Sequence, residues 1–186
     1  MTSSQIILDY KKLEPFLDQY RKDKKKIILN QGPVDMVHIG HARYCEKAKS
    51  YGDVLIVGVD SDEKVKKRKG PDRPIVPEDE RLEMLTHLRA VDLVVLKKLD
   101  APKWDLIKLI QPDVLVATKK TYTDEQIEEL KQWCKKIVVL DPMATTSTSA
   151  KLRLVQMGAT KKVSAAFSKK LVKSIEEVLA ELKGDA

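Results

Sequence analysis

Short apolar runs alternate with amphipathic segments along most of the chain, and this alternation predicts the fold. Five runs rich in Val, Ile and Leu lie at residues 26–30, 53–59, 92–96, 113–117 and 136–140. Uninterrupted apolar runs of this length are typical of strands buried on both faces of a sheet. Helical patterns lie between them, at residues 38–50, 78–90, 102–111 and 123–134. The chain is therefore predicted to be of the α/β class, with a doubly wound, five-stranded parallel sheet and right-handed crossovers.

Helical patterns also flank this region at both ends of the chain. Residues 9–23 predict a helix packed on the main domain, and residues 150–157 and 161–183 predict two more. The apolar stripe of the last helix packs on its own domain or on a second copy in a homodimer, and the sequence leaves both open. We expect an N-terminal helix, a main domain and a C-terminal helical extension, at residues 1–24, 25–158 and 159–186.

The composition favours a cytoplasmic protein with no membrane span. No apolar run approaches the roughly 20 residues that cross a bilayer. Residues 1–4 lack the basic start and apolar stretch of a signal peptide. The two cysteines fit a reducing compartment and, with only three histidines, are too few for a zinc framework.

The formal charge of +7 has two readings. It is typical of a solvated, lysine-rich surface, and it would also attract a polyanion such as a nucleoside triphosphate. Nucleic acid is the rival partner, but aromatic residues make up only 5% of the chain. Few aromatic platforms are then available for stacking single-stranded bases, which argues against that partner.

The strongest chemical signal is the segment from residue 31 to residue 41, between the first strand and the helix after it. Gly32 permits a tight turn there. His38 and His41 stand three residues apart, so both are expected on one face of the first helical turn. Gly40 would let a phosphate approach the backbone beside the positively polarised helix start. Two imidazole donors in this place suit a phosphoryl group that gains charge during transfer, each contributing about 3 kcal/mol.

Residues 38–41, His-Ile-Gly-His, resemble the HxGH signature of the nucleotidyltransferase superfamily. Its cytidylyltransferase-like branch carries Gly-Thr/Cys-Phe-Asp-x-x-His-x-Gly-His, which this chain matches at Gly32, Asp35, His38, Gly40 and His41 but not at Pro33 and Val34. The resemblance implies a Rossmann-like fold, with residues 25–158 as the nucleotidyltransferase domain. It also implies that the two histidines stabilise the transferring phosphoryl group and that Mg²⁺ enters with the nucleotide, whose phosphates supply most of its ligands.

Other segments resemble two groups within this branch. Residues 69–75 resemble the Lys-Gly-x-x-Arg-Pro segment of ADP-heptose synthase adenylyltransferase domains, and the likeness to those domains covers residues 5–157. Residues 89–92, Arg-Ala-Val-Asp, resemble the Arg-Tyr-Val-Asp of glycerol-3-phosphate cytidylyltransferases. We expect transfer of a nucleoside monophosphate, slightly favouring ATP as its source, to a small phosphorylated sugar or polyol. The alternative is CTP with a glycerol-phosphate-like or amino-alcohol phosphate.

Positions after the strands, together with this resemblance, give three sets of candidate site residues. The catalytic candidates are His38, His41 and Lys69. The nucleotide-binding candidates are Gly32, Pro33, Val34, Asp35, Gly40, Arg89, Ser147, Thr148 and Ser149. The acceptor-binding candidates are Lys66, Arg73, Lys103 and Lys119, and no residue is expected to be a dedicated metal ligand. Residues 64–69 are expected to form a hydrophilic loop whose cations neutralise phosphate charge.

The chain also departs from the family pattern. Residues 117–122 replace the usual Gly-x-Asp-Tyr, and Met143 or its neighbours occupy the place of a phosphate-binding arginine. These departures motivate a different class of function, a nucleotide-binding sensor without catalysis. A class I aminoacyl-tRNA synthetase would need a longer chain and a second, lysine-rich signature. Phosphopantetheine and nicotinamide-mononucleotide adenylyltransferases stay open within the same chemistry.

Overall fold

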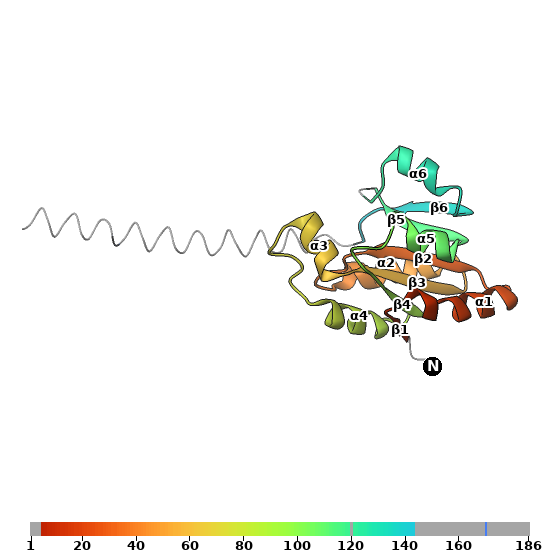
Figure 1. The fold of residues 1–186 in the computed structure, drawn as a ribbon, viewed down its shortest axis with the longest axis horizontal. Helices are drawn as coiled ribbons and strands as arrows, with labels where there is room; N and C mark the ends of the chain where they lie inside the picture. Colours follow the sequence, from red (N-terminus) through yellow and green to blue (C-terminus); the bar gives the residue numbers. More distant parts are fainter. Residues whose placement is uncertain (1–4, 120, 144–169, 171–186) are drawn as a thin grey trace, which may run out of the picture. The chain divides into compact units, whose positions relative to one another are not determined.

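Six parallel strands form the central sheet of the computed structural model, which describes residues 5–119, 121–143 and 170 (Figure 1). The strand order is β1-β4-β3-β2-β5-β6. The chain starts the inner sheet at β2, builds β3 and β4 on one side of it, and returns to place β5 on the other side. The strands are β1 Gln5–Ile7, β2 Ile27–Gly32, β3 Val54–Asp60, β4 Leu93–Lys97, β5 Val114–Thr118 and β6 Lys136–Leu140.

The predicted α/β class and the doubly wound parallel sheet are confirmed, but the predicted number of five strands is wrong. The additional strand is β1, which pairs with β4 at one edge of the sheet. Only Ile7 of its three residues is buried, so its sequence carries too little apolar periodicity to predict a strand. Its pairing with β4, and not its own pattern, makes it a strand.

Helices cover both faces of the sheet, and the strands alternate their side chains between them. On one face, α1, α5 and α6 pack their apolar residues against the sheet; on the other, α2 and α4 do so. Ile27 and Leu29 of β2 point to the first face and Ile28 to the second. The helices are α1 Glu14–Lys22, α2 Ile39–Lys49, α3 Asp62–Lys69, α4 Glu78–Thr86, α5 Asp105–Ile110 and α6 Asp124–Leu130.

Two predicted elements take a different form. The pattern over residues 9–23 is a short 3₁₀ turn, Tyr10–Lys12, followed by α1, which begins at Glu14 and has Pro15 in its first turn, a position that proline fits. The expected loop over residues 64–69 is part of helix α3. Ser61 caps that helix, acidic residues fill its first turn and basic residues its last, so the capping and charge signals were present in the sequence.

The predicted elements after residue 143 lie outside the described residues. This applies to the helix at residues 150–157, to the C-terminal extension at 159–186 and to the candidates Ser147, Thr148 and Ser149. The proposed boundaries between the three parts of the chain therefore stay predictions. In the described part of the chain, no helix has both the length and the apolar character needed to cross a membrane.

Gly58 of β3 allows three side chains to meet where the sheet ends. It pairs in register with Gln31 of β2. A Cβ atom at Gly58 would lie 2.7 Å from Cδ2 of Leu106, 2.9 Å from Cδ of Lys97 and 3.2 Å from Cβ of Gln31. Helix α5 can therefore approach β3 closely, and the side chains of Gln31 and Lys97 can stand beside each other.

We predict that Gly58→Ala lowers the free energy of unfolding by about 1–3 kcal/mol, because the added methyl group overpacks this contact. Urea unfolding measures the change. Gly32→Ala is the matched control, since a Cβ there has nothing within 4 Å and should leave stability nearly unchanged. Equal effects of the two substitutions would contradict the close-approach argument.

Candidate active site

His38 and His41 form a reciprocal cap at the start of α2. Nδ1 of His38 accepts a hydrogen bond from the backbone N–H of Gly40 at 3.1 Å. Nδ1 of His41 accepts one from the backbone N–H of His38 at 3.2 Å. The two ring centroids are 4.2 Å apart. His38 has an extended backbone with φ of −142° and is the N-cap, so the prediction that both histidines belong to the first helical turn is wrong for His38.

The cap determines which ring nitrogens carry hydrogen. Because each Nδ1 accepts a backbone N–H, the hydrogen of each neutral ring belongs on Nε2. Burial, with the nearby His38, lowers the pKa of His41 to about 4, and Lys69 adds to the shift while Asp35 opposes it. His41 is therefore neutral near pH 7 and offers Nε2–H as a hydrogen-bond donor.

The loop between β2 and α2 has two residues in the left-handed region of backbone space. Val34 has φ of 44° and Met36 has φ of 53°, whereas no positive φ occurs at Gly32. A β-branched residue at positive φ is strained, at a cost of order 1–3 kcal/mol. The sharp turn that the sequence suggested for Gly32 is thus made at Val34 and Met36. Strain of this kind persists only where surrounding contacts fix the loop.

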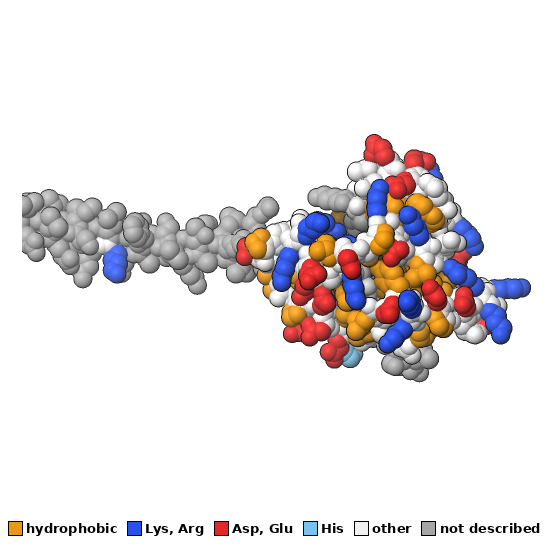
Figure 2. Space-filling view, in the orientation of Figure 1, with side chains coloured by type: hydrophobic (Ala, Val, Ile, Leu, Met, Phe, Trp, Pro, Cys, Tyr) orange, Lys and Arg blue, Asp and Glu red, His pale blue; other side chains and the backbone are white. Residues whose placement is uncertain are grey.

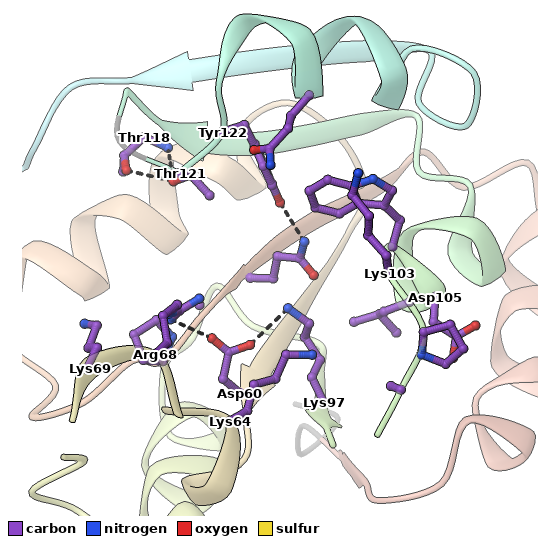
Figure 3. Close-up of a pocket in the computed structure, with 18 of the residues that line it drawn as sticks. Asp60, Lys64, Arg68, Lys69, Lys97, Lys103, Asp105, Thr118, Thr121 and Tyr122 are labelled. Carbon is purple, nitrogen blue, oxygen red and sulfur yellow. Dashed lines mark hydrogen bonds and ion pairs between the residues drawn. The ribbon is translucent and has the colours of Figure 1, made fainter. Parts of the chain in front are cut away.

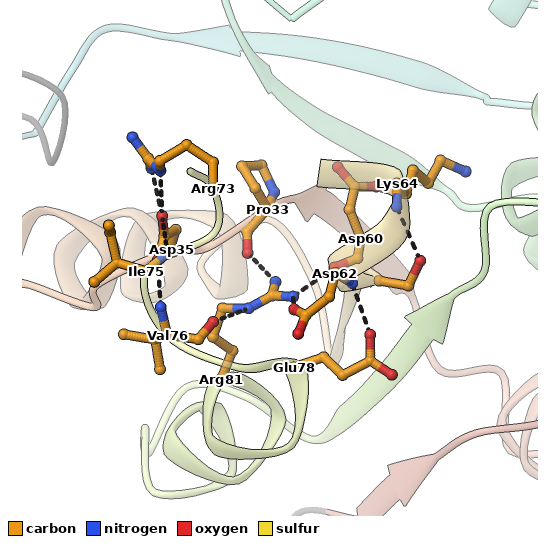
Figure 4. Close-up of polar contacts among 11 residues, drawn as sticks. Pro33, Asp35, Asp60, Asp62, Lys64, Arg73, Ile75, Val76, Glu78 and Arg81 are labelled. Carbon is orange, nitrogen blue, oxygen red and sulfur yellow. Dashed lines mark hydrogen bonds and ion pairs between the residues drawn. The ribbon is translucent and has the colours of Figure 1, made fainter. Parts of the chain in front are cut away.

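Arg81 of α4 provides such contacts from a position where only 1% of the residue is exposed. Its Nη1 donates to the backbone carbonyl of Pro33, and its Nη2 donates to the carbonyl of Asp60 at 2.9 Å. Nη2 also pairs with the carboxylate of Asp62 at 2.7 Å, and Nε donates to the carbonyl of Val76 at 2.9 Å (Figure 4). One guanidinium therefore joins the ends of β2 and β3, the start of α3 and the segment before α4.

Asp35 is buried, and its carboxylate is bound from within the protein (Figure 4). It accepts hydrogen bonds from the backbone N–H groups of Ile75 and Val76, both at 3.1 Å, and from Nε of Arg73 at 2.8 Å. Burial alone would raise its pKa, but these backbone donors and the Arg73 charge lower it below the ordinary value. Asp35 and Arg73, which the sequence predicts to bind the nucleotide and the acceptor respectively, pair with each other, and their binding roles stay predictions.

A cleft of about 680 Å³ opens at the carboxyl ends of the strands, with residues from β2, β3, β4 and β5 in its wall (Figure 3). It extends across α3, the segment before α5, and Thr121 and Tyr122 before α6. The sheet reverses its strand order between β2 and β5, and ligands of open α/β sheets bind beyond the strand ends at such a point. The volume suits a small-molecule site.

An ion cluster around the buried Asp60 lies in the wall of this cleft. Oδ1 of Asp60 lies 3.1 Å from Nζ of Lys97, and Oδ2 lies 2.8 Å from Nη2 of Arg68. Burial would raise the pKa of Asp60, but Lys97 and Arg68 together hold it below its ordinary value. Burial lowers the pKa of Lys97, and Asp60 opposes that shift. Each charge thus keeps the other ionised in a place poorly reached by water.

The structure gathers part of the predicted set at the cleft. Gly32, Pro33, Lys69 and Lys103 all line it. Lys69 also connects the cleft with the histidines, because its charge contributes to the lowered pKa of His41. Burial, Arg73 and Arg68 lower the pKa of Lys69 itself. The histidine pair and the cleft are therefore neighbouring parts of one region.

Three predicted residues lie elsewhere among the described residues. Arg89 is 90% exposed and precedes the amino end of β4, away from the strand ends that form the cleft. Lys66 is exposed on α3 and does not line the cleft. Lys119 pairs with Asp141 at 2.9 Å and lines a shallower depression beside α6. Val34 and Gly40 belong to the loop and the cap that shape the histidine pair.

Sequence reasoning gave no role to Gln31, Asp60, Lys97 or Arg81. Gln31, Asp60 and Lys97 lie near the carboxyl ends of β2, β3 and β4, on the face of the sheet that α1 and α5 cover. On that face they follow residues that are mostly apolar. Polar residues at the ends of three neighbouring apolar runs could therefore have been predicted from the sequence to lie at the site. For Arg81 no such signal exists, because an arginine in an amphipathic helix is ordinarily expected on the surface.

The described residues do not offer a metal site of their own, since no group of three or more His, Cys, Asp or Glu side chains among them could hold an ion. On the face shown in Figure 2, Lys and Arg side chains are interspersed with Asp and Glu. The described part of this face therefore shows no continuous basic stripe of the kind that follows a nucleic-acid backbone.

We predict that the free energy of unfolding declines as the pH falls from about 6.5 to about 4, because the unfolded His41 takes up a proton before the folded one does. In His41→Asn, a carboxamide oxygen can replace Nδ1 as the acceptor without titrating, so this decline should be smaller. Urea unfolding at several pH values measures it. His87→Asn, at an exposed histidine, is the control, and a decline reduced equally in both variants would reject the assignment.

We also predict that Asp35→Asn lowers the free energy of unfolding by about 3 kcal/mol, because it leaves the largely buried Arg73 without its counter-charge. Asp72→Asn, in the exposed part of the same loop, should change it little. Urea unfolding and nucleotide titration of both variants separate a structural role from a binding role. Weaker nucleotide binding by Asp35→Asn at unchanged stability would support direct binding instead.

Comparisons with known proteins agree with this geometry. A sequence profile described as Cytidylyltransferase-like matches residues 31–180. The protein named Bifunctional protein HldE from Sulfurimonas denitrificans is 38% identical over 154 residues, covering 82% of this chain and 32% of the relative. Its namesake from Nitratiruptor sp. is 45% identical over 114 residues, covering 61% and 24%. The chain thus spans at most about a third of the length of these relatives.

Solved structures share the fold. A lipopolysaccharide core biosynthesis protein from Thermoplasma volcanium superposes with a TM-score of 0.55 at 23% identity, covering 64% of this chain and 99% of that one. Pantoate-β-alanine ligase from Francisella tularensis gives a TM-score of 0.58 at 18% identity, covering 78% and 69%. With the profile match over most of the chain, the protein belongs to the cytidylyltransferase-like family.

Proposed function

We propose that this protein is a nucleotidyltransferase, which moves a nucleoside monophosphate from a nucleoside triphosphate to a small sugar phosphate or polyol phosphate. The observation that carries the proposal is the histidine cap, because both Nδ1 atoms accept backbone N–H groups and each neutral ring then carries its hydrogen on Nε2, a donor suited to a phosphate oxygen. Gly32 adjoins this cap, and a Cβ at Gly32 would meet nothing within 4 Å. A phosphate group can therefore approach the loop there.

In the proposed reaction an oxygen of the acceptor phosphate attacks the α-phosphorus of the triphosphate. A new phosphorus–oxygen bond forms, the bond from the α-phosphorus to the bridging oxygen breaks, and pyrophosphate leaves with that electron pair. Charge builds on the oxygens of the α-phosphate as the transition state forms. Donors fixed by the backbone need no rearrangement at that moment, so His38 and His41 can stabilise this charge.

The charge of the cleft suits two phosphorylated substrates. Among the described residues that line it, five side chains are cationic (Lys64, Arg68, Lys69, Lys97 and Lys103) and two are carboxylates (Asp60 and Asp105). Lys69 lines the cleft, and its charge contributes to the lowered pKa of His41, so its ammonium group could neutralise charge on the reacting phosphates. Mg²⁺ bound with the nucleotide would take most of its ligands from the phosphates.

The proposed nucleotide is ATP. Residues 69–75 resemble the adenylyltransferase domains of ADP-heptose synthases, and Asp35 anchors this segment next to the histidine loop. Of the two features that favour CTP, Arg89 lies at the opposite ends of the strands from the cleft, whereas Lys103, at the spacing of an acceptor-binding lysine in cytidylyltransferases, lines the cleft. We propose a sugar phosphate as the acceptor, because residues 69–75 resemble the adenylyltransferase domains of ADP-heptose synthases.

We predict that His38→Asn lowers kcat by about 10²–10³ while the KM for the triphosphate changes little, because the lost contact acts mainly in the transition state. Asparagine can still cap α2 through its side-chain oxygen, so stability should be retained. Pyrophosphate release from ATP, CTP and GTP, with sugar, polyol and choline phosphates as acceptors, measures the effect.

His87→Asn is the control for this assay, since His87 is exposed on the segment after α4. An unchanged kcat in His38→Asn would reject the role of the cap in catalysis. Binding of a triphosphate without turnover on any acceptor would instead favour a nucleotide sensor over an enzyme.

A further inference from the structure

Three polar side chains stand side by side where the sheet meets the cleft. They are Gln31 of β2, Asp60 of β3 and Lys97 of β4, each at the carboxyl end of an inward-facing row. The residues that precede them on the same face of each strand are apolar and pack against α1 and α5, except for Gly58. Because Gly58 has no side chain, it leaves room for Gln31 and Lys97. Polar groups in this row are therefore a local feature of the cleft wall.

Asp60 is occupied by protein cations, whereas Lys97 has donors to spare. Both carboxylate oxygens of Asp60 are paired, one with Lys97 and one with Arg68. An ammonium group has three hydrogens, and Asp60 takes one of those on Lys97. The Lys97 side chain is 14% exposed and lines the cleft, so the remaining N–H groups are available to a ligand there.

Gln31 supplies the complementary acceptor. Its Nε2 donates to the hydroxyl of Tyr122 at 2.6 Å, which fixes the amide against the cleft wall. Its Oε1 is buried and accepts no hydrogen bond from the described residues. A buried carbonyl oxygen without a donor is destabilising, and a hydrogen-bond donor on a ligand would satisfy it. A hydroxyl group can accept from Lys97 and donate to Gln31 at the same time.

The two ends of the cleft differ in chemistry. Figure 3 shows Arg68 and Lys69 on one side, Lys103 and Asp105 on the other, and Asp60 and Lys97 between them. Beyond Lys97 the wall contains Trp104, whose ring packs edge-on against Tyr122 with centroids 5.5 Å apart. A phosphate fits the side that carries Arg68 and Lys69. On the other side Nζ of Lys103 lies 4.9 Å from the centroid of the Trp104 ring, so a hydroxylated ring bound there would meet an ammonium group beside the aromatic surface.

We propose that Gln31 and Lys97 select the acceptor by binding a hydroxyl group of its sugar or polyol part, which lies in the cleft against Trp104 and Tyr122. This assignment rests on the proposed transfer to a phosphorylated acceptor and adds the residues that distinguish a polyhydroxylated acceptor from a simple phosphate ester. A site built to pair with a hydroxyl rejects ligands that lack it, because its polar groups would then stay unpaired.

Binding can be measured without turnover through the fluorescence of Trp104. The chain contains two tryptophans, so Trp133→Phe leaves Trp104 as the single reporter. Glucose 1-phosphate, mannose 1-phosphate and glycerol 3-phosphate are titrated beside methyl phosphate, which has no hydroxyl-bearing carbon. We expect at least one hydroxylated ligand to bind 10-fold or more tightly than methyl phosphate. Gln31→Met and Lys97→Met should each reduce that ratio at least 10-fold, with methyl phosphate binding unchanged in Gln31→Met.

Gln132→Met is the matched control, because it makes the same substitution at an exposed glutamine that does not line the cleft. It should retain most of the selectivity, whereas a loss equal to that of Gln31→Met would overturn direct recognition. If Lys97→Met unfolds because it leaves the buried Asp60 charge unbalanced, the double variant Asp60→Asn/Lys97→Met removes both charges. This double variant should lose selectivity in the same way. Selectivity unchanged in Gln31→Met, or absent from the parent protein, also overturns the proposal.

The same proteins are assayed for pyrophosphate release, which keeps the two proposals distinguishable. Turnover with an unaltered acceptor preference in Gln31→Met sinks the recognition role alone. Selective binding that depends on Gln31, without turnover of any triphosphate, sinks the transfer reaction while leaving the hydroxyl site in place.

Discussion

The buried guanidinium of Arg81 is the contact on which the arrangement of the site depends. It binds the end of β2, the end of β3, the first residue of α3 and the segment before α4 through four hydrogen bonds. A guanidinium is planar and offers five donors in fixed directions, so it can hold several carbonyl and carboxylate groups in one geometry. Without it, the strained turn at Val34 and the Asp60 backbone would lose a common anchor.

From this anchor the site divides into two chemical parts. The histidine cap uses backbone N–H groups to fix both imidazoles, so the orientation of the rings follows from the helix start itself. The cleft uses a buried ion cluster, in which Lys97 and Arg68 balance Asp60. Lys69 links the two parts through its charge. A cap that supplies donors and a cleft that supplies cations together suit transfer between two phosphates.

Several site features could be predicted from sequence because they depend on neighbours along the chain. The histidine spacing, the preceding strand and the following helix located the cap, and the apolar runs located five of the six strands. The α3 helix was missed although Ser61 and the charge order of its turns indicate a capped helix. Asp35 was assigned to the nucleotide, but its partners Arg73, Ile75 and Val76 come from a segment about 40 residues away, which local patterns do not reveal.

By itself the sequence determined the α/β class, the order of the main elements and the histidine pair. The spacing of apolar residues and the capping of a helix start both depend on residues that are close together along the chain. Only the tertiary structure decided the sixth strand, the burial of Arg81 and the meeting of Gln31, Asp60 and Lys97. Those three residues belong to strands separated by some 30 to 40 residues and meet because parallel strands bring their carboxyl ends to one edge of the sheet. The space between them is set by the absence of a side chain at Gly58 and by the close approach of α5.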